Sequence, residues 1–410
     1  MTPFRELYWN IPWHGAIYLL FLPFLACCLY GGFRLVRAVR GGQPHSWAPL
    51  TARQLSDVWA QVVLQLRLLR DPLAGAIHAA IAWGFGILVV ATVLVALQDY
   101  LGLPVLRGPF YLYFMALTVD LFGVACTLGT AAALLRRYGL RPRRLWDPRG
   151  VESYAVFLGL LLAILLSGYL VEGLRIAATG DPWAAWSPGG WLASLPFAGL
   201  PAATQLLWHR LAWWGHAVLA FGFIALLPFT LIRHIVAAPL AISQRPPDGS
   251  RALDRMDLEE AEHFGVSALG GFRRTELLDL LACTECGRCQ DACPAWAAGK
   301  PLTPKGLVAD LRDHLLSDAA GRPDPRPLVG GVMNEEALWA CTTCGACREA
   351  CPVYIDTIPK TMGMRRFLVM EEARFPAPMQ AALRGLESRG HPYQGAVPGR
   401  TAWAEGLGVP

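Results

Sequence analysis

Eight of the eleven cysteines stand in two runs of identical spacing. The first run is Cys283, Cys286, Cys289 and Cys293, followed by Pro294; the second is Cys341, Cys344, Cys347 and Cys351, followed by Pro352. Each run reads C-x2-C-x2-C-x3-C-P, a spacing in which three thiolates bind one iron–sulfur cube and the fourth binds another. Zinc sites use pairs of C-x2-C, and neither they nor disulfides account for a duplicated run. The chain is therefore predicted to bind two [4Fe-4S] clusters.

The fourth cysteine of each run decides the ligand sets. If the usual crossover holds, one set is Cys283, Cys286, Cys289 and Cys351, and the other is Cys341, Cys344, Cys347 and Cys293. Free thiolates require a reducing compartment for this part of the chain. The other three cysteines (Cys27, Cys28 and Cys126) fall in apolar segments, where we expect them to pack as small hydrophobic residues.

Histidine is costly inside a bilayer unless it has a ligand or a partner. His78 and His234 are expected at one depth near the cytoplasmic ends of two antiparallel spans, as a bis-histidine b-type haem requires. The alternative is a pair of hydrogen-bonded core histidines. His14 and His216 match in depth near the outer face; they could ligate a second haem, or His216 could line a quinone pocket, and we favour a single haem.

One acidic residue falls inside an apolar segment. Asp120 is expected near the middle of the third span, where a carboxylate is expensive. It could bind a haem propionate, relay protons to a quinone, or make a helix–helix hydrogen bond. Glu172 and Arg175 are three residues apart at a helix end and should pair with each other.

These side chains must be positioned by membrane helices. The chain has 410 residues, of which 54% are hydrophobic and 16% charged, and its mean hydropathy is +0.36. This composition predicts several membrane spans, and five segments are long enough. They run over 12–36, 73–98, 110–135, 152–175 and 206–242. The fold expected for residues 1–242 is an all-α, five-helix cytochrome b bundle.

Arginine placement predicts the direction of the spans. Six arginines follow the first span and six follow the third, namely Arg34, Arg37, Arg40, Arg53, Arg67, Arg70, Arg136, Arg137, Arg141, Arg143, Arg144 and Arg149. The positive-inside rule then places the N-terminus outside and the region after the fifth span in the cytoplasm. The first span is expected to be an uncleaved anchor. Because the basic residues flank apolar spans, nucleic acid is not an expected partner.

The cysteine runs belong to a second domain. Residues 243–275 are predicted to be a linker, 276–376 the cluster domain, and 377–410 an extended C-terminal tail. Forty-seven residues (294–340) separate the runs and carry helix signals, including Thr303-Pro304 as a start and an amphipathic stretch from Leu307 to Leu316. Small two-cluster ferredoxins keep their motifs closer and use strands, so an α-helical ferredoxin domain is expected.

Residues 283–376 resemble the iron–sulfur domain of heterodisulfide-reductase-related proteins, especially the electron-transfer-flavoprotein:menaquinone oxidoreductase family. The resemblance rests on Leu277-Leu278-Asp279, Gly299-Lys300-Pro301-Leu302-Thr303-Pro304-Lys305, Leu338-Trp339-Ala340-Cys341-Thr342-Thr343-Cys344 and Arg365-Arg366-Phe367-Leu368-Val369-Met370. Residues 1–245 resemble the membrane cytochrome of that group, which is similar to the nitrate reductase gamma subunit. That match rests on Tyr8-Trp9-Asn10-Ile11, Asp120-Leu121-Phe122-Gly123 and the two histidines 18 residues apart.

The resemblance implies a quinone oxidoreductase of a prokaryotic inner membrane, with a reduced flavoprotein as donor and menaquinone as acceptor. The nitrate reductase subunit has a further histidine ten residues along its second span, where this chain has Leu88. The resemblance therefore implies one haem b, at His78 and His234. Single-chain family members continue into cysteine-rich repeats, so a separate cysteine-rich catalytic subunit is an expected partner. Two rival functions remain open: a sulfur-compound or heterodisulfide-type quinone oxidoreductase subunit, and a non-catalytic anchor that only conducts electrons.

Overall fold

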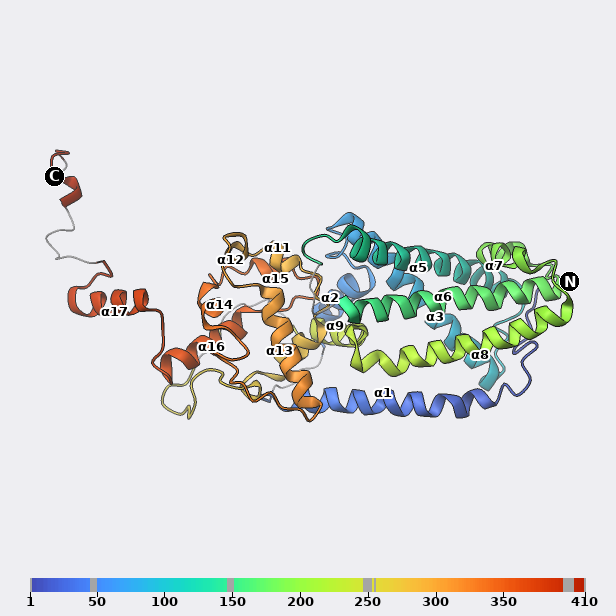
Figure 1. Cartoon of the computed structure of the whole chain (residues 1–410), viewed down its shortest axis with the longest axis horizontal. Helices are drawn as coiled ribbons and strands as arrows, with labels where there is room; N and C mark the ends of the chain where they lie inside the picture. The colour runs from blue at the N-terminus through green and yellow to red at the C-terminus, as the bar shows by residue number, and fades with distance from the viewer. Residues whose placement is uncertain are drawn as a thin grey trace.

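The computed structural model describes residues 2–44, 50–145, 151–245, 253, 256–393 and 402–408, with side chains in the fourth long helix from residue 154 onward. Within these residues the fold is helical, and extended pairing is limited to three isolated bridges. Figure 1 shows a long helical bundle, with the N-terminus at its far end, joined end to end with a smaller domain of short helices. The all-α prediction is confirmed.

Five long apolar helices form the bundle, as predicted. They are α1 (Ala16–Arg40), α3 (Pro72–Leu101), a third helix over Gly108–Leu140 that contains α5 (Val119–Leu134), α6 (Val151–Thr179), and α8 (Ala202–Leu226) with its continuation to Phe229. Asp71 starts α3, because its carboxylate accepts a hydrogen bond from the Ala74 N–H. Gly102, at φ 69°, ends the helix.

The fifth span is broken, and its predicted continuous range of 206–242 is wrong. The long helix ends at Phe229, and Thr230 has an extended backbone (φ −121°, ψ 177°). Pro228 stands in the last turn, where a proline lacks the N–H that would continue the helix. A short 3-10 turn, η7 (Leu231–Arg233), then leads into a separate helix, α9 (His234–Ser243). Hydropathy alone could not reveal this break, because both sides of it are apolar.

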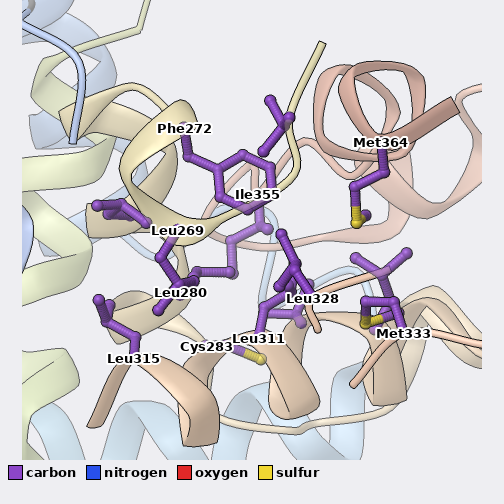
Figure 2. Close-up of a cluster of buried hydrophobic side chains, with 14 of the residues drawn as sticks. Leu269, Phe272, Leu280, Cys283, Leu311, Leu315, Leu328, Met333, Ile355 and Met364 are labelled. Atoms are coloured by element: carbon purple, nitrogen blue, oxygen red, sulfur yellow. The ribbon is translucent and has the colours of Figure 1, made fainter. Parts of the chain in front are cut away.

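The cluster domain is built on one hydrophobic core. Its main helices are α10 (Arg274–Ala282), α13 (Pro304–Ala319), α14 (Glu335–Ala340) and α16 (Ile358–Met370), with short helices α11 (Arg288–Asp291), α12 (Pro294–Ala297) and α15 (Ala346–Ala350) after the cysteines. The predicted helix start at Thr303-Pro304 is confirmed. Figure 2 shows Cys283 beside Leu311 and near Leu280, with Phe272 farther away in the same core, so the first cysteine belongs to this core.

The same core includes the end of the membrane domain. Ala237, Ala238 and Ala241 of α9 pack into it beside α10. The helix that begins at His234 is thus packed against the helix that ends at Cys283. The break at Thr230 makes this possible, because it lets α9 leave the bundle.

The tail is not uniformly extended as predicted. Residues Ala377–Arg389 form a helix, α17, which projects away from the cluster domain in Figure 1. Pro378 lies in its first turn, a position that tolerates proline, and Gly390 at φ 72° ends it. Because prolines at a helix start resemble prolines in extended chain, the sequence alone was misleading here.

Arginines of the predicted cytoplasmic loops hold the cluster domain. The Arg70 guanidinium pairs with Glu349 at 3.0 Å, and Arg34 donates to the Ala319 carbonyl at 2.8 Å. Arg144 pairs with Asp71 and lies 3.8 Å from Asp291. The cluster domain therefore lies on the arginine-rich side of the bundle, and its location in the cytoplasm stays a prediction.

Candidate functional site

The two cysteine runs share one backbone form. Two residues after the first cysteine of each run, the backbone adopts the left-handed conformation (Glu285, φ 51°; Thr343, φ 56°). The glycine two positions further on does the same (Gly287, φ 75°; Gly345, φ 80°). The backbone N–H of Glu285 points to Cys283 Sγ at 3.4 Å, and that of Thr343 points to Cys341 Sγ at 3.4 Å. Such N–H groups favour a thiolate over a thiol, which is the form that binds iron.

The cysteines line two cavities in the crossed pattern. One, here called the proximal cavity, is about 450 Å³ including its mouth and is lined by Cys283, Cys286, Cys289 and Cys351, and also by Cys347, which lines the second cavity as well. The other, the distal cavity, is about 380 Å³ and is lined by Cys341, Cys344, Cys347 and Cys293. Each cavity thus collects the three leading cysteines of one run and the last cysteine of the other.

Within the residues described, no three Cys, His, Asp or Glu side chains converge on a point that would hold a single metal ion. Four thiols set apart around a cavity suit a cube instead, because each cysteine then binds a different iron. The residues present therefore fit two [4Fe-4S] clusters.

The two cavities differ in their surroundings. The proximal one faces the bundle, since Gly287 lies against the Arg144 carbonyl and Arg288 donates to the Leu68 carbonyl at 3.1 Å. In the distal loop, Thr342, Thr343 and Cys344 are exposed. The proximal cavity is therefore the one nearer the membrane, and the distal one is open to a partner.

The pKa values of the cysteine thiols differ with their burial. It raises the pKa of Cys283 to about 11, although Arg312 and the Glu285 N–H act in the opposite direction. Burial likewise raises the pKa of Cys351. The pKa of the exposed Cys344 is lowered by hydrogen bonds, first from the Ala346 backbone and then from Thr342. Bound iron must therefore stabilise the buried thiolates.

His78 and His234 belong to elements that pack on one another. His78 lies in α3, whose Ile81 packs against the core cluster that contains Ile232, two residues before His234. His78 Nδ1 lies 2.9 Å from Gln65 Oε1, and His234 Nδ1 lies 2.6 Å from the Leu231 carbonyl. Partners at Nδ1 fix the ring orientation and leave Nε2 of both rings for iron. The pair therefore fits a bis-histidine haem.

The outer histidines have different partners. His14 is exposed and stacks on Tyr8, with ring centroids 4.5 Å apart. His216 Nδ1 lies 2.9 Å from Ser167 Oγ of α6. The second haem at His14 and His216 stays a prediction. A further histidine of α8, His209, is only 3% exposed, and its Nδ1 lies 3.4 Å from Asn10 Nδ2.

Asp120 has a structural partner. Its two carboxylate oxygens accept hydrogen bonds from the Gly189 N–H at 2.7 Å and the Gly190 N–H at 2.9 Å, at the start of α7 (Pro188–Ser194). This matches the helix–helix alternative, and the quinone role stays a prediction. The expected Glu172–Arg175 pair is confirmed at 2.9 Å.

Three groups of this region escaped sequence reasoning. Gln65, which holds His78, carries no pattern in the sequence. Tyr354, three residues after Cys351, is held between the guanidinium groups of Arg67 (3.9 Å from the ring centroid) and Arg245 (3.4 Å). Arg233 is buried directly before His234. Only the position of Tyr354 beside a cysteine run could have drawn attention to it.

Two protein families match this chain. Residues 76–252 match the nitrate reductase gamma subunit, and residues 279–355 match the 4Fe-4S dicluster domain. The chain is 34% identical over its whole length to the EtfAB:quinone oxidoreductase of Syntrophomonas wolfei, covering 62% of that relative. It is 28% identical over 92% of its length to the probable iron–sulfur-binding oxidoreductase FadF of Bacillus subtilis, covering 59% of it.

Shorter relatives match the cluster domain. Over 25% of its length the chain is 30% identical to one component of the ferredoxin/F(420)H(2)-dependent CoB-CoM heterodisulfide reductase of Methanosarcina acetivorans, covering 55% of that component. No solved structure matches. The chain is thus similar to the quinone and iron–sulfur-binding oxidoreductases of the family that its resemblance predicted, and it spans about three fifths of the length of these two relatives.

Proposed function

We propose that this relative of the membrane iron–sulfur oxidoreductases is a quinone oxidoreductase subunit that carries electrons between a cytoplasmic donor and quinone in a prokaryotic inner membrane. The observation that carries the proposal is the line of sites: an exposed four-cysteine cavity, a second one against the bundle, and a histidine pair just beyond it. The bound clusters and haem b would supply one-electron transfer, and the protein holds and tunes them.

Each side chain then has a role. The crossed cysteine sets hold the two [4Fe-4S] clusters, and His78 and His234 hold the haem. The loop of Gln65 and the carbonyl of Leu231 fix the two imidazoles. Asp120 and His216 stay the quinone-site candidates, with Asp120 acting through α7, whose first N–H groups it holds.

The exposed distal loop is the proposed entry for electrons. The name of the Syntrophomonas relative supports electron transfer flavoprotein as donor and a quinone, in our proposal menaquinone, as acceptor. Because that relative is longer, a cysteine-rich catalytic part is proposed to contact the distal loop.

Reoxidation by quinone tests the proposal. The purified protein is reduced with dithionite, excess reductant is removed, and a short-chain menaquinone analogue is added while the haem and cluster absorbances are followed. The proposal expects both signals to be reoxidised. If they stay reduced while ferricyanide oxidises them, the chain is a conductor whose quinone site lies elsewhere.

The match to a heterodisulfide reductase component favours one second candidate, a sulfur-compound:quinone oxidoreductase subunit. Partner capture from the native membrane distinguishes the two. A co-purifying flavoprotein that reduces the clusters supports the first function. A co-purifying thiol or disulfide enzyme that does so supports the second.

A further inference from the structure

One pair of side chains lies in the wall between the two cavities. Cys347 and Thr357 each line both the proximal and the distal cavity, and among the described residues the two cavities share no other lining residue. The Sγ of Cys347 lies 3.1 Å from the Oγ1 of Thr357, and Thr357 is only 5% exposed. This contact between a sulfur and a hydroxyl is therefore buried between the two proposed clusters.

The Thr357 hydroxyl does not have the role that a threonine at a helix start usually has. Thr357 stands directly before α16, but its side chain makes no hydrogen bond to the first turn of that helix. Thr303, which stands directly before α13, does make such a bond, at 3.3 Å. At α16 the Asp356 carboxylate accepts a hydrogen bond from the Ile358 N–H at 3.1 Å instead. The Thr357 hydroxyl is thereby left for the cysteine sulfur.

Neighbouring contacts hold both partners of this hydrogen bond in place. The Thr357 carbonyl accepts hydrogen bonds from the N–H of Thr361 at 3.0 Å and from its hydroxyl at 2.9 Å. Asp356, directly before Thr357, pairs at 2.8 Å with Arg348, which directly follows Cys347. The backbone on each side of the contact is thus fixed by bonds that do not involve the Thr357 hydroxyl.

Iron binding decides the direction of the hydrogen bond. Without iron either atom can donate, but a cysteine that binds iron is a thiolate and has no proton to give. The Thr357 hydroxyl then donates to Cys347 Sγ. A hydrogen bond to a thiolate sulfur strengthens as the cluster becomes more negative, so it stabilises the reduced cluster more than the oxidised one. Burial keeps water from competing for the sulfur.

We propose that Thr357 positions and tunes the distal cluster by donating its hydroxyl hydrogen bond to the ligand Cys347. The inference rests on the proposed function and on the crossed ligand sets, in which Cys347 binds the distal cluster. The hydrogen bond raises the reduction potential of that cluster, which is the proposed entry for electrons from the cytoplasmic donor. It also fixes the one ligand that lies in the wall between the two clusters.

The test is redox potentiometry followed by electron paramagnetic resonance on the full-length protein. Thr357→Val removes the hydroxyl at nearly constant shape, Thr357→Ala removes it without adding a second methyl group, and Thr357→Ser retains it. Thr361→Val is the matched control, because Thr361 also lines the distal cavity but its hydroxyl donates to the Thr357 carbonyl. Cys344→Ser changes an exposed distal ligand and so identifies the distal transition.

The expected result is a roughly tenfold loss in the equilibrium constant for reduction of the distal cluster in Thr357→Val and Thr357→Ala, about 59 mV for one electron. The proximal transition should stay near its wild-type potential in both variants. Thr357→Ser and Thr361→Val should keep both potentials. Loss of distal iron from the two hydroxyl-free variants, with full iron in Thr357→Ser, would also support the proposal.

Three results would overturn it: an unchanged distal potential in Thr357→Val and Thr357→Ala, an equal shift of both clusters, or a change in Thr357→Ser as large as that in Thr357→Val. Quinone takes no part in this measurement. A wild-type protein that fails to be reoxidised by the menaquinone analogue would defeat the proposed function and leave the role of Thr357 readable.

Discussion

His78 and His234, the proposed haem ligands, are each held in a fixed orientation by one contact. Each ring has its Nδ1 fixed by a protein oxygen, from Gln65 or from the Leu231 carbonyl, while Nε2 is left for another partner. The two cluster sites could be predicted from the sequence because three of the four cysteines of each site lie close together in the chain. The role of Gln65 could not, because only the folded chain brings it to His78.

Removal of either histidine should abolish haem binding. His78→Ala and His234→Ala are each expected to reduce the haem content of the purified protein at least tenfold while leaving iron and sulfide unchanged. The pyridine haemochrome assay measures this. His209→Gln is the control, since His209 is also buried but contacts Asn10 and Trp9 instead. Full haem content in His78→Ala would refute the ligand assignment.

Gly287 is required by contact as well as by conformation. A side chain there would overlap the Arg144 carbonyl, whereas Gly299 has a similar φ (73° against 75°) and open space around it. Both alanine variants pay the left-handed penalty of about 1–2 kcal/mol. Gly287→Ala should in addition displace the proximal loop and lose iron to a greater extent. Equal iron content in Gly287→Ala and Gly299→Ala would contradict this.

At the scale of the elements, the broken fifth span matters most. The break at Thr230 frees α9 to pack on α10, and so joins the helix that begins at His234, a proposed haem ligand, to the helix that precedes Cys283, a proposed cluster ligand. The five spans were predictable because each is a long, continuous run of apolar residues. The break and α17 were not, because proline marks a helix start as readily as an interruption.

The break is packed against α1 through Gly31. A methyl group there would overlap Pro228 and Phe229, whereas Gly32 has nothing within 4 Å. Gly31→Ala should therefore destabilise the protein by about 1–3 kcal/mol through overpacking. Gly32→Ala should be neutral or slightly stabilising. Thermal unfolding in detergent, followed by the haem absorbance, measures the difference; equal midpoints would show that α1 does not pack there.

At the scale of the whole molecule, the arginines that predicted topology also dock the cluster domain. Arg67, which precedes α3, and Arg245, which follows α9, enclose the Tyr354 ring beside the proximal cavity. Charge counting predicted the side of the domain, but it could not predict which arginines would contact it.

Loss of the Tyr354 ring should loosen this docking. Tyr354→Leu removes two cation–π contacts, each worth about 0.5–2 kcal/mol. Hydrogen exchange should rise in residues 64–71, which carry Arg67 and contact the domain. Tyr393→Leu is the control, because that ring is exposed and stacks only on His391. Unchanged hydrogen exchange in Tyr354→Leu would mean that the docking of the cluster domain does not depend on this ring.

The central claim is that electrons reach the haem through the proximal cavity. The most direct measurement is the rate of haem reduction in sealed vesicles by a photoreduced, membrane-impermeant donor on the cluster side. It is compared with Cys286→Ser protein that retains haem. The account predicts fast reduction in the native protein and at least a hundredfold slower reduction in the variant. Equal rates would contradict it.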